Sequence, residues 1–277
     1  MDKPLSYFAR RRLAWWLAAA AAGLVLVGLV GFLRTALRPA GLYTGVLLYA
    51  LVVGLALFNG RKKLPFLPLA RASTWLQIHI YVGWLAVLVF FLHIGLRWPE
   101  GAFVRLLAAV FLLVAASGVV GLILTRWLPG FLARSGEPLT YERIPEHRAE
   151  IRARIEALIT AADRDSESST LGDFYLNHLM DYIEANPGPF PALDGQDRPY
   201  RRTVEALASL ERYFNPHERE VAAALREWIE AKRNLDNQLV GQRLLKLWLF
   251  VHIPASASLL LLGLVHGVIA LRYAGGF

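Results

Sequence analysis

The sequence predicts an all-α fold, an integral membrane bundle of five transmembrane helices with a helical cytoplasmic insertion between helices 4 and 5. Three observations support this fold class. The 277 residues are 56% hydrophobic with a mean hydropathy of +0.40, which is more apolar than ordinary soluble domains. Five apolar runs are long enough to cross the hydrocarbon layer, which takes about 20 helical residues. The long segment before the last run is polar and contains no such run.

We expect the five spans at about 13–33, 41–59, 75–96, 103–125 and 247–271. The first follows a short basic segment, as in a secretion signal. Its apolar part is longer than that of a signal, and no A-x-A-like cleavage site follows it, so we expect a retained span. The chain therefore divides into residues 1–128 with helices 1–4, the insertion 129–246, and residues 247–277 with helix 5.

Charge is distributed unevenly along the chain. Residues 129–246 hold 16 Lys/Arg and 20 Asp/Glu, whereas the remainder holds 14 basic residues and 2 acidic ones. A basic remainder made of apolar runs favours membrane anchoring over nucleic-acid binding. With the N-terminus inside, the inner side carries nine Lys/Arg against five outside, which is the favoured orientation. We expect a multi-pass inner (plasma) membrane protein with a cytoplasmic N-terminus and insertion and a periplasmic C-terminus.

The insertion is predicted to be helical. The stretch IPEHRAEIRARIEALITAA has helical periodicity, and NPGPFPALDGQDRP at 186–199 is typical of a turn-rich linker. Asn215 followed by Pro216 is a good start signal for a helix. From there a single helix could continue into the fifth span.

Two apolar stretches each begin and end with histidine: HIYVGWLAVLVFFLH at 79–93 and HIPASASLLLLGLVH at 252–266. An interval of fourteen residues is close to four helical turns and rises about 21 Å, so both histidines of a stretch share one helix face. The third and fifth spans cross the membrane in the same direction. His79 should therefore lie level with His252, and His93 level with His266.

Two opposed imidazoles at each level are the axial ligands that a haem iron needs. Because the chain has no cysteine, iron–sulfur clusters and covalently attached haem are excluded, and two haem b groups are predicted. A single histidine could instead be an interhelical hydrogen bonder or a proton relay. A transport site would need His and Asp/Glu at one depth, whereas the two levels lie about 21 Å apart and no span contains a carboxylate. A non-redox transporter or anchor with structural histidines is the alternative.

Several other residues are candidates for the cofactor environment. Arg97, one turn outside His93, could pair with a haem propionate or simply extend to the membrane interface. Arg71, Arg243 and Lys246 are candidates for the inner haem on the same two interpretations.

Several small residues in the spans also have two interpretations. Gly83 and Gly263 could let a porphyrin approach the helix backbone or serve ordinary helix packing, and so could the small residues Ser117, Gly118 and Gly121. Glu100 could accept a proton from a quinol, although surface solvation is the simpler interpretation.

Paired H-x13-H stretches on the third and fifth of N-in helices resemble the membrane domain of ferric reductases and NADPH oxidases. They also resemble the cytochrome b of quinol–cytochrome c reductases. The resemblance covers the membrane spans, and it implies that the four histidines are axial ligands of two haems. The insertion has no counterpart in either family, and it has no G-x-G-x-x-G after a strand, so we do not expect oxidation of NAD(P)H by this chain.

The expected function is therefore a dihaem cytochrome b subunit of a respiratory-chain oxidoreductase complex. It would carry electrons between a quinone pool or cytoplasmic donor and a periplasmic redox partner. Flavoprotein, iron–sulfur or c-type cytochrome subunits are the expected partners besides the lipid bilayer, and quinone is a candidate ligand. A quinol or metal reductase complete in one chain is a third possibility.

Overall fold

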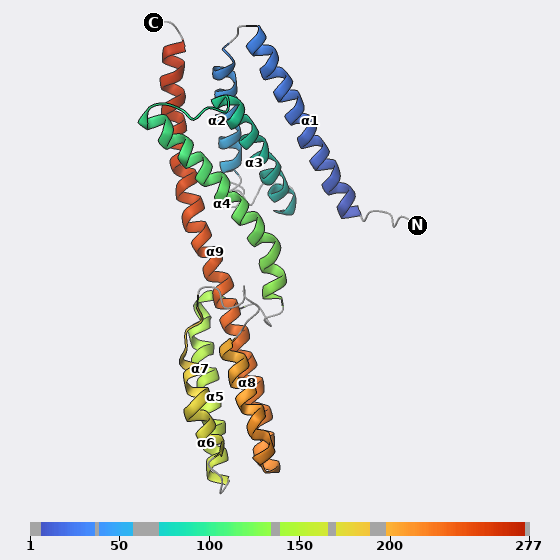
Figure 1. Cartoon of the computed structure of the whole chain (residues 1–277), viewed down its shortest axis with the longest axis vertical. Coiled ribbons are helices and arrows are strands. Elements are labelled where there is room, and N and C mark those ends of the chain that lie inside the picture. Colours follow the sequence, from blue (N-terminus) through green and yellow to red (C-terminus); the bar gives the residue numbers. More distant parts are fainter. Residues whose placement is uncertain are drawn as a thin grey trace, which may run out of the picture. The chain divides into compact units, whose positions relative to one another are not determined.

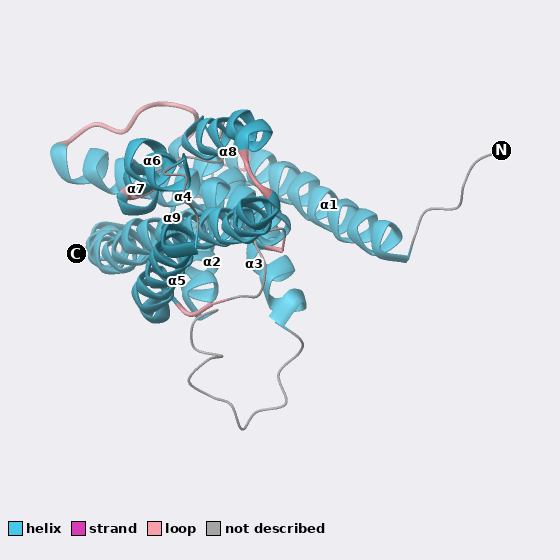
Figure 2. Cartoon of the chain, turned by 90° about the horizontal axis from the view of Figure 1, so that it is seen from below, coloured by secondary structure: helices cyan, strands magenta, loops and turns pink. Residues whose placement is uncertain are grey.

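The computed structural model describes residues 7–36, 39–57, 72–133, 139–165, 170–188 and 198–274. All regular structure within these ranges is helical, and they contain no strand (Figure 2). The chain separates into two compact units. The first comprises residues 1–122 and 249–277, and the second comprises residues 123–248.

The long helices are α1 (Tyr7–Thr35), α2 (Ala40–Ala56), α3 (Ala72–Ile94), α4 (Ala102–Leu132) and α9 (Pro216–Ala274). All except α2 contain a segment that is long and apolar enough to cross a membrane. The apolar helix α2 has 17 residues, and the predicted end of its span at 58–59 lies outside the described residues. The chain is therefore all-helical, with several apolar helices of membrane-spanning length.

In the first unit, α3 lies beside both α2 and α1 (Figure 1). Phe90 of α3 stacks on Phe111 of α4 with ring centroids 4.2 Å apart, and Leu259 of α9 joins the same buried cluster. Tyr81 of α3 stacks on Trp15 of α1 at 6.0 Å. Aromatic rings thus hold α1 and α4 to α3.

The outer surface of this unit is strongly apolar. Leu24 and Phe32 of α1 are 75% and 66% exposed, and Phe250 and Leu261 of α9 are 77% and 67% exposed. Soluble proteins rarely expose large continuous apolar surfaces, because water makes them costly. A lipid environment removes that cost, and helices satisfy their own backbone hydrogen bonds within it.

The end of α3 is fixed one residue beyond His93. Gly95 adopts a positive φ of 64°, and the Leu96 amide donates to the carbonyl of Phe91 at 3.2 Å. This is the hydrogen bond of a Schellman motif, which glycine permits at low cost. His93 therefore lies in the last turn of α3.

The second unit is a bundle of helices around a closed core. Besides the end of α4 and the first part of α9, its elements are η2 (Tyr141–Arg143), α5 (Ile144–Asp165), α6 (Thr170–Phe174), the π-helical turn η3 (Tyr175–Leu179), α7 (Met180–Glu184), α8 (Arg198–Leu210) and η4 (Glu211–Tyr213). Ile155, Leu179, Leu207, Leu225 and Ile229 are completely buried. Unlike the first unit, this one places its large apolar side chains inside, as water-soluble domains do.

The start of α9 carries a capping box. The Asn215 side chain accepts from the Glu218 amide at 2.7 Å, and the Glu218 carboxylate accepts from the Asn215 amide at 2.9 Å. Both donors would otherwise lack a helical partner. The helix begins at Pro216 and continues unbroken through Ala274, as the sequence predicts.

The fourth long helix is longer than the predicted span 103–125. It continues to Leu132, past Pro129, although proline in a helix interior removes one backbone hydrogen bond. Leu128 is buried, and a Cβ built on Gly241 of α9 would lie 2.9 Å from it and 3.0 Å from Leu132. Close packing of these leucines on α9 offsets the cost of the proline.

Candidate cofactor-binding site

His93 of α3 and His266 of α9 lie close together in the first unit. Their ring centroids are 6.3 Å apart and the rings are inclined at 81°. A metal ion held between two imidazoles lies about 2 Å from each nitrogen, which places the ring centroids roughly 6 Å apart. The observed separation fits two imidazoles on opposite sides of one metal.

Hydrogen bonds from α2 orient the His93 ring. Its Nδ1 lies 3.0 Å from the carbonyl oxygen of Gly41 and 3.1 Å from the Thr44 hydroxyl. A carbonyl can only accept, so Nδ1 carries the proton in the neutral ring and Nε2 carries the lone pair. Histidine ligands of metals usually have such a partner, which fixes their tautomer.

A cavity of about 640 Å³ adjoins both histidines. It is lined mainly by apolar side chains of α2, α3, α4 and α9, and its volume is within the usual range of small-molecule sites, roughly 300–1,000 Å³. Arg97 and Gly263, both predicted from the sequence, line this cavity, and so does Glu100. The cavity, the paired imidazoles and the nearby arginine suit an iron porphyrin with two carboxylates.

His79 of α3 and His252 of α9 are close enough for electrostatic interaction. The Nδ1 of His252 lies 2.7 Å from the hydroxyl oxygen of Ser117 in α4. The His79 ring faces the backbone carbonyl of Leu55 in α2. These two histidines do not line the cavity at His93 and His266.

The two predicted glycines differ in their surroundings. A Cβ at Gly83 would meet nothing within 4 Å, whereas one at Gly263 would lie 3.2 Å from the ring of Tyr49. Gly263 therefore serves close helix packing on α2 while it also lines the cavity. The Tyr49 hydroxyl donates to the carbonyl of Leu260 at 3.4 Å and strengthens this contact.

The sequence also offered three basic residues for the inner haem, and two of them belong to the second unit. Lys246 belongs to the second unit, where its Nζ lies 3.4 Å from the ring centre of Tyr141 and 3.8 Å from Glu142. Arg243 also belongs to the second unit and is exposed. Arg71 lies outside the described residues.

Comparison with known proteins does not assign the chain to a family. No protein-family model, curated protein or solved structure matches the chain. The histidine pairs and their neighbours are therefore the basis for inferring function.

The sequence did not identify the contribution of α2. Gly41, Thr44 and Gly45 all contact or approach His93, and a Cβ on Gly45 would lie 3.0 Å from its Cε1. Glycines four residues apart share one helix face and allow close approach of another helix, so the pair was a usable signal. The role of Ser117 gave no signal, because serine in an apolar helix commonly bonds its own backbone.

Among the described residues, no three His, Asp or Glu side chains come together as a metal-binding group. A metal held only by protein side chains usually needs three or four, whereas a porphyrin iron takes two axial ligands from the protein.

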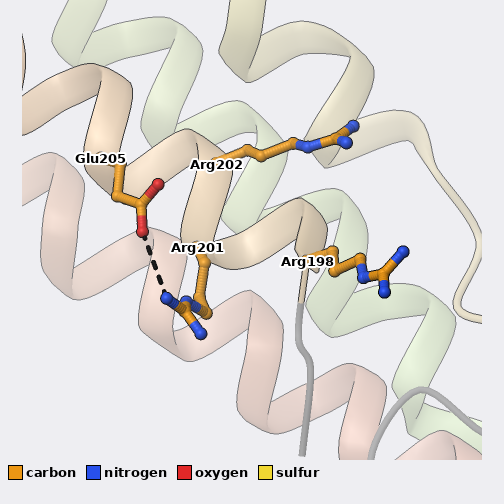
Figure 3. A pocket seen from close by; sticks show the side chains of 4 residues that line it. All are labelled: Arg198, Arg201, Arg202 and Glu205. Atoms are coloured by element: carbon orange, nitrogen blue, oxygen red, sulfur yellow. Dashed lines mark ion pairs between the residues drawn. The ribbon is translucent and has the colours of Figure 1, made fainter. Parts of the chain in front are cut away.

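A shallow hollow of about 280 Å³ in the second unit is lined by Arg198, Arg201, Arg202 and Glu205 of α8. Arg201 pairs with Glu205 at 3.6 Å, and both side chains are about two-thirds exposed. The three guanidinium groups point in different directions (Figure 3). They do not converge on one ligand position, so we interpret them as solvated surface charge.

Proposed function

We propose that the chain is a dihaem cytochrome b subunit that carries electrons across a membrane. The observation that carries the proposal is the opposed pair His93 and His266, 6.3 Å apart beside a cavity of about 640 Å³ in an apolar helical unit. The interaction of His79 with His252 gives a second pair on the same two helices.

Each protein group has a distinct role in this proposal. His93 and His266 would hold one haem iron, and His79 and His252 the other. The Gly41 carbonyl keeps the Nε2 lone pair of His93 available, and Arg97 would neutralise a propionate at the cavity edge. A haem whose axial positions are both filled by histidine supplies one-electron transfer and has no vacant position for oxygen or substrate. The apolar lining excludes water from the iron ligands.

The proposed topology has five spans in the inner membrane, with α2 as the second. The N-terminus and the insertion would be cytoplasmic and the C-terminus periplasmic, in line with the excess of Lys/Arg on the inner loops. The water-soluble type of core in the second unit supports an insertion that lies outside the bilayer.

Electrons would come from a quinone pool or a cytoplasmic donor and leave to a periplasmic partner. Flavoprotein, iron–sulfur or c-type cytochrome subunits are the proposed partners. The insertion would dock one of them, because the chain has no cysteine for a cluster.

The direct test is the haem content and low-spin spectrum of purified full-length protein. We expect a b-type spectrum with two haems per chain, one of which is lost in His93→Ala. The matched control is His178→Ala, which removes an exposed histidine of the second unit and should leave both haems. A colourless wild-type protein, or unchanged haem content in His93→Ala, would contradict the proposal and favour a transporter or anchor.

Double variants test the pairing itself. His93→Ala combined with His266→Ala should remove the same single haem as either change alone. His93→Ala combined with His252→Ala should remove both. The opposite pattern would mean that the histidines pair crosswise.

A further inference from the structure

The Ser117 hydroxyl lies within hydrogen-bond distance of both a backbone carbonyl and the His252 ring. The Ser117 hydroxyl lies 2.8 Å from the carbonyl oxygen of Val114 and donates its single proton to it. Its oxygen is 2.7 Å from Nδ1 of His252, so it accepts from the ring when Nδ1 carries the proton. This tautomer leaves the lone pair on Nε2, which is what axial ligation through Nε2 requires.

We propose that Ser117 is a positioning residue that sets both the tautomer and the electron-donating strength of His252 as an axial ligand. This inference rests on the proposed function, because it concerns the haem that His79 and His252 would hold. A ligand imidazole that donates from Nδ1 becomes more basic at Nε2. A more basic axial ligand stabilises ferric iron and lowers the reduction potential, and second-shell hydrogen bonding is one of the main means by which proteins adjust haem potentials.

Ser117 lies on α4, whereas His252 lies on α9. The serine is 8% exposed, so water does not readily replace its oxygen as the acceptor. At the other pair, Nδ1 of His93 lies near both the Thr44 hydroxyl at 3.1 Å and the backbone carbonyl of Gly41 at 3.0 Å, and no side-chain substitution removes that carbonyl. His93 thus keeps a backbone acceptor in any side-chain variant, whereas Ser117 contacts His252 through a replaceable hydroxyl group.

Ser256 provides a matched control one turn beyond His252. Its hydroxyl donates at 2.7 Å to the backbone carbonyl of His252 and not to the imidazole ring. Ser256→Ala therefore removes a serine hydroxyl from the same region without changing the ring's acceptor.

The experiment is a redox titration of the full-length haem-loaded protein, with low-spin electron paramagnetic resonance spectra of the same samples. In Ser117→Ala we expect one of two reduction potentials to rise and the corresponding low-spin signal to shift, while the other haem stays unchanged. Ser117→Thr retains the hydroxyl and should restore both wild-type values. Ser256→Ala should match the wild type.

The outcomes separate the two proposals. A wild-type protein without haem overturns the proposed function itself. Two wild-type potentials that are unchanged in Ser117→Ala overturn the role of Ser117 and leave the function intact. Ser117→Ala could instead lose one haem. Retention of that haem in Ser117→Thr would then support the role of Ser117. Loss of the haem in both variants would indicate a packing defect and overturn that role.

Discussion

At the scale of single residues, the contact between α2 and His93 depends on the absence of a side chain at Gly45. A Cβ there would lie 3.0 Å from Cε1 and 3.5 Å from Nδ1 of His93. The ring would have to move by a few tenths of an ångström, away from the Gly41 carbonyl that orients it. Gly54 on the same helix has no atom within 4 Å of the equivalent position.

Gly45→Ala should therefore be less stable than Gly54→Ala, although both gain the same helix propensity. Overpacking of this kind typically costs about 1–3 kcal/mol, and we expect a difference of that order in thermal unfolding of the detergent-solubilised protein. Only Gly45→Ala should also change the low-spin signal of the haem that we propose at His93. Equal behaviour of the two variants would show that His93 is not held against α2.

A second residue-scale feature is a buried ion pair in the second unit. Lys232 is 2% exposed; its Nζ lies 2.5 Å from the Asp236 carboxylate and 4.4 Å from the ring centre of Tyr182. It also donates to the carbonyl of Ala185 at 3.4 Å. The ammonium group is thus surrounded by acceptors from α9 and from the end of α7.

Asp236→Ala removes the carboxylate and leaves a buried ammonium group, which typically costs about 3–5 kcal/mol. The double change Lys232→Met with Asp236→Leu should recover most of that loss, because the buried ammonium group is removed together with the carboxylate. Hydrogen exchange of the α5 and α7 amides in the full-length protein measures the opening free energy. As the control, Glu205→Ala breaks an exposed pair with Arg201 and should cost less than about 1 kcal/mol. If Asp236→Ala cost no more than Glu205→Ala, the result would show that Lys232 is hydrated.

At the scale of elements, α5 is joined to its neighbours by a group of exposed polar side chains. Arg152 donates to Glu156 at 2.8 Å and lies 3.2 Å from Glu184 of α7. The Tyr175 hydroxyl donates to Glu156 at 3.3 Å. The hydrogen bond from Arg152 holds the pKa of Glu156 below its usual range, and burial raises the pKa of Tyr175.

A carboxylate with a lowered pKa in the folded state stabilises the fold above its unfolded pKa, which for glutamate is about 4.3. That contribution is lost as the pH falls through the folded pKa. Glu156→Gln should therefore lower the melting temperature of the insertion slightly at pH 7, and the difference from wild type should vanish once Glu156 itself is protonated. Glu220→Gln, at an exposed glutamate of α9, should change little at either pH. A Glu156→Gln effect that is constant down to pH 3 would rule out the ionic contribution.

How far the elements could be predicted depends on the kind of signal each one carries. The start of α9 followed from Asn215 and Pro216, because a cap is a local interaction. The continuation of α4 past Pro129 could not be predicted, since it depends on packing against Gly241, which is distant in sequence. The sequence also could not predict which side of each apolar helix faces its neighbours. Lipid-facing and protein-facing sides are both apolar there, so no periodicity distinguishes them, and the contacts of Thr44 and Ser117 emerged only from the structure.

At the scale of the whole molecule, the chain combines one unit with an apolar surface and one with an apolar core. The histidine pattern predicted which four side chains of the first unit form its proposed site, because an interval of fourteen residues places both histidines of a helix on the same face. The parts of the cavity that come from α2 were not predicted, since the glycines at 41 and 45 indicate a face for close packing but do not identify His93 as its neighbour. The proposed topology places the second unit on the cytoplasmic side.

The absence of cysteine makes this topology directly testable with single introduced thiols. Ala102 and Ala208 are both exposed, the first at the start of α4 and the second on α8. A membrane-impermeant maleimide should label Ala102→Cys from the periplasmic side of intact cells and Ala208→Cys only after permeabilisation. The reverse pattern would invert the proposed orientation, and labelling of both sites from one side would contradict the single crossing by α4 between Ala102 and Ala208.

The four histidines lie on two continuous helices, which has a consequence for how this protein can evolve. Inserting or deleting one residue between two histidines would turn one of them by about 100° around its helix and move it by about 1.5 Å. Its partner on the other helix would then no longer face it. Related proteins should accordingly tolerate length changes in their connecting loops but share, without gaps, both fourteen-residue intervals.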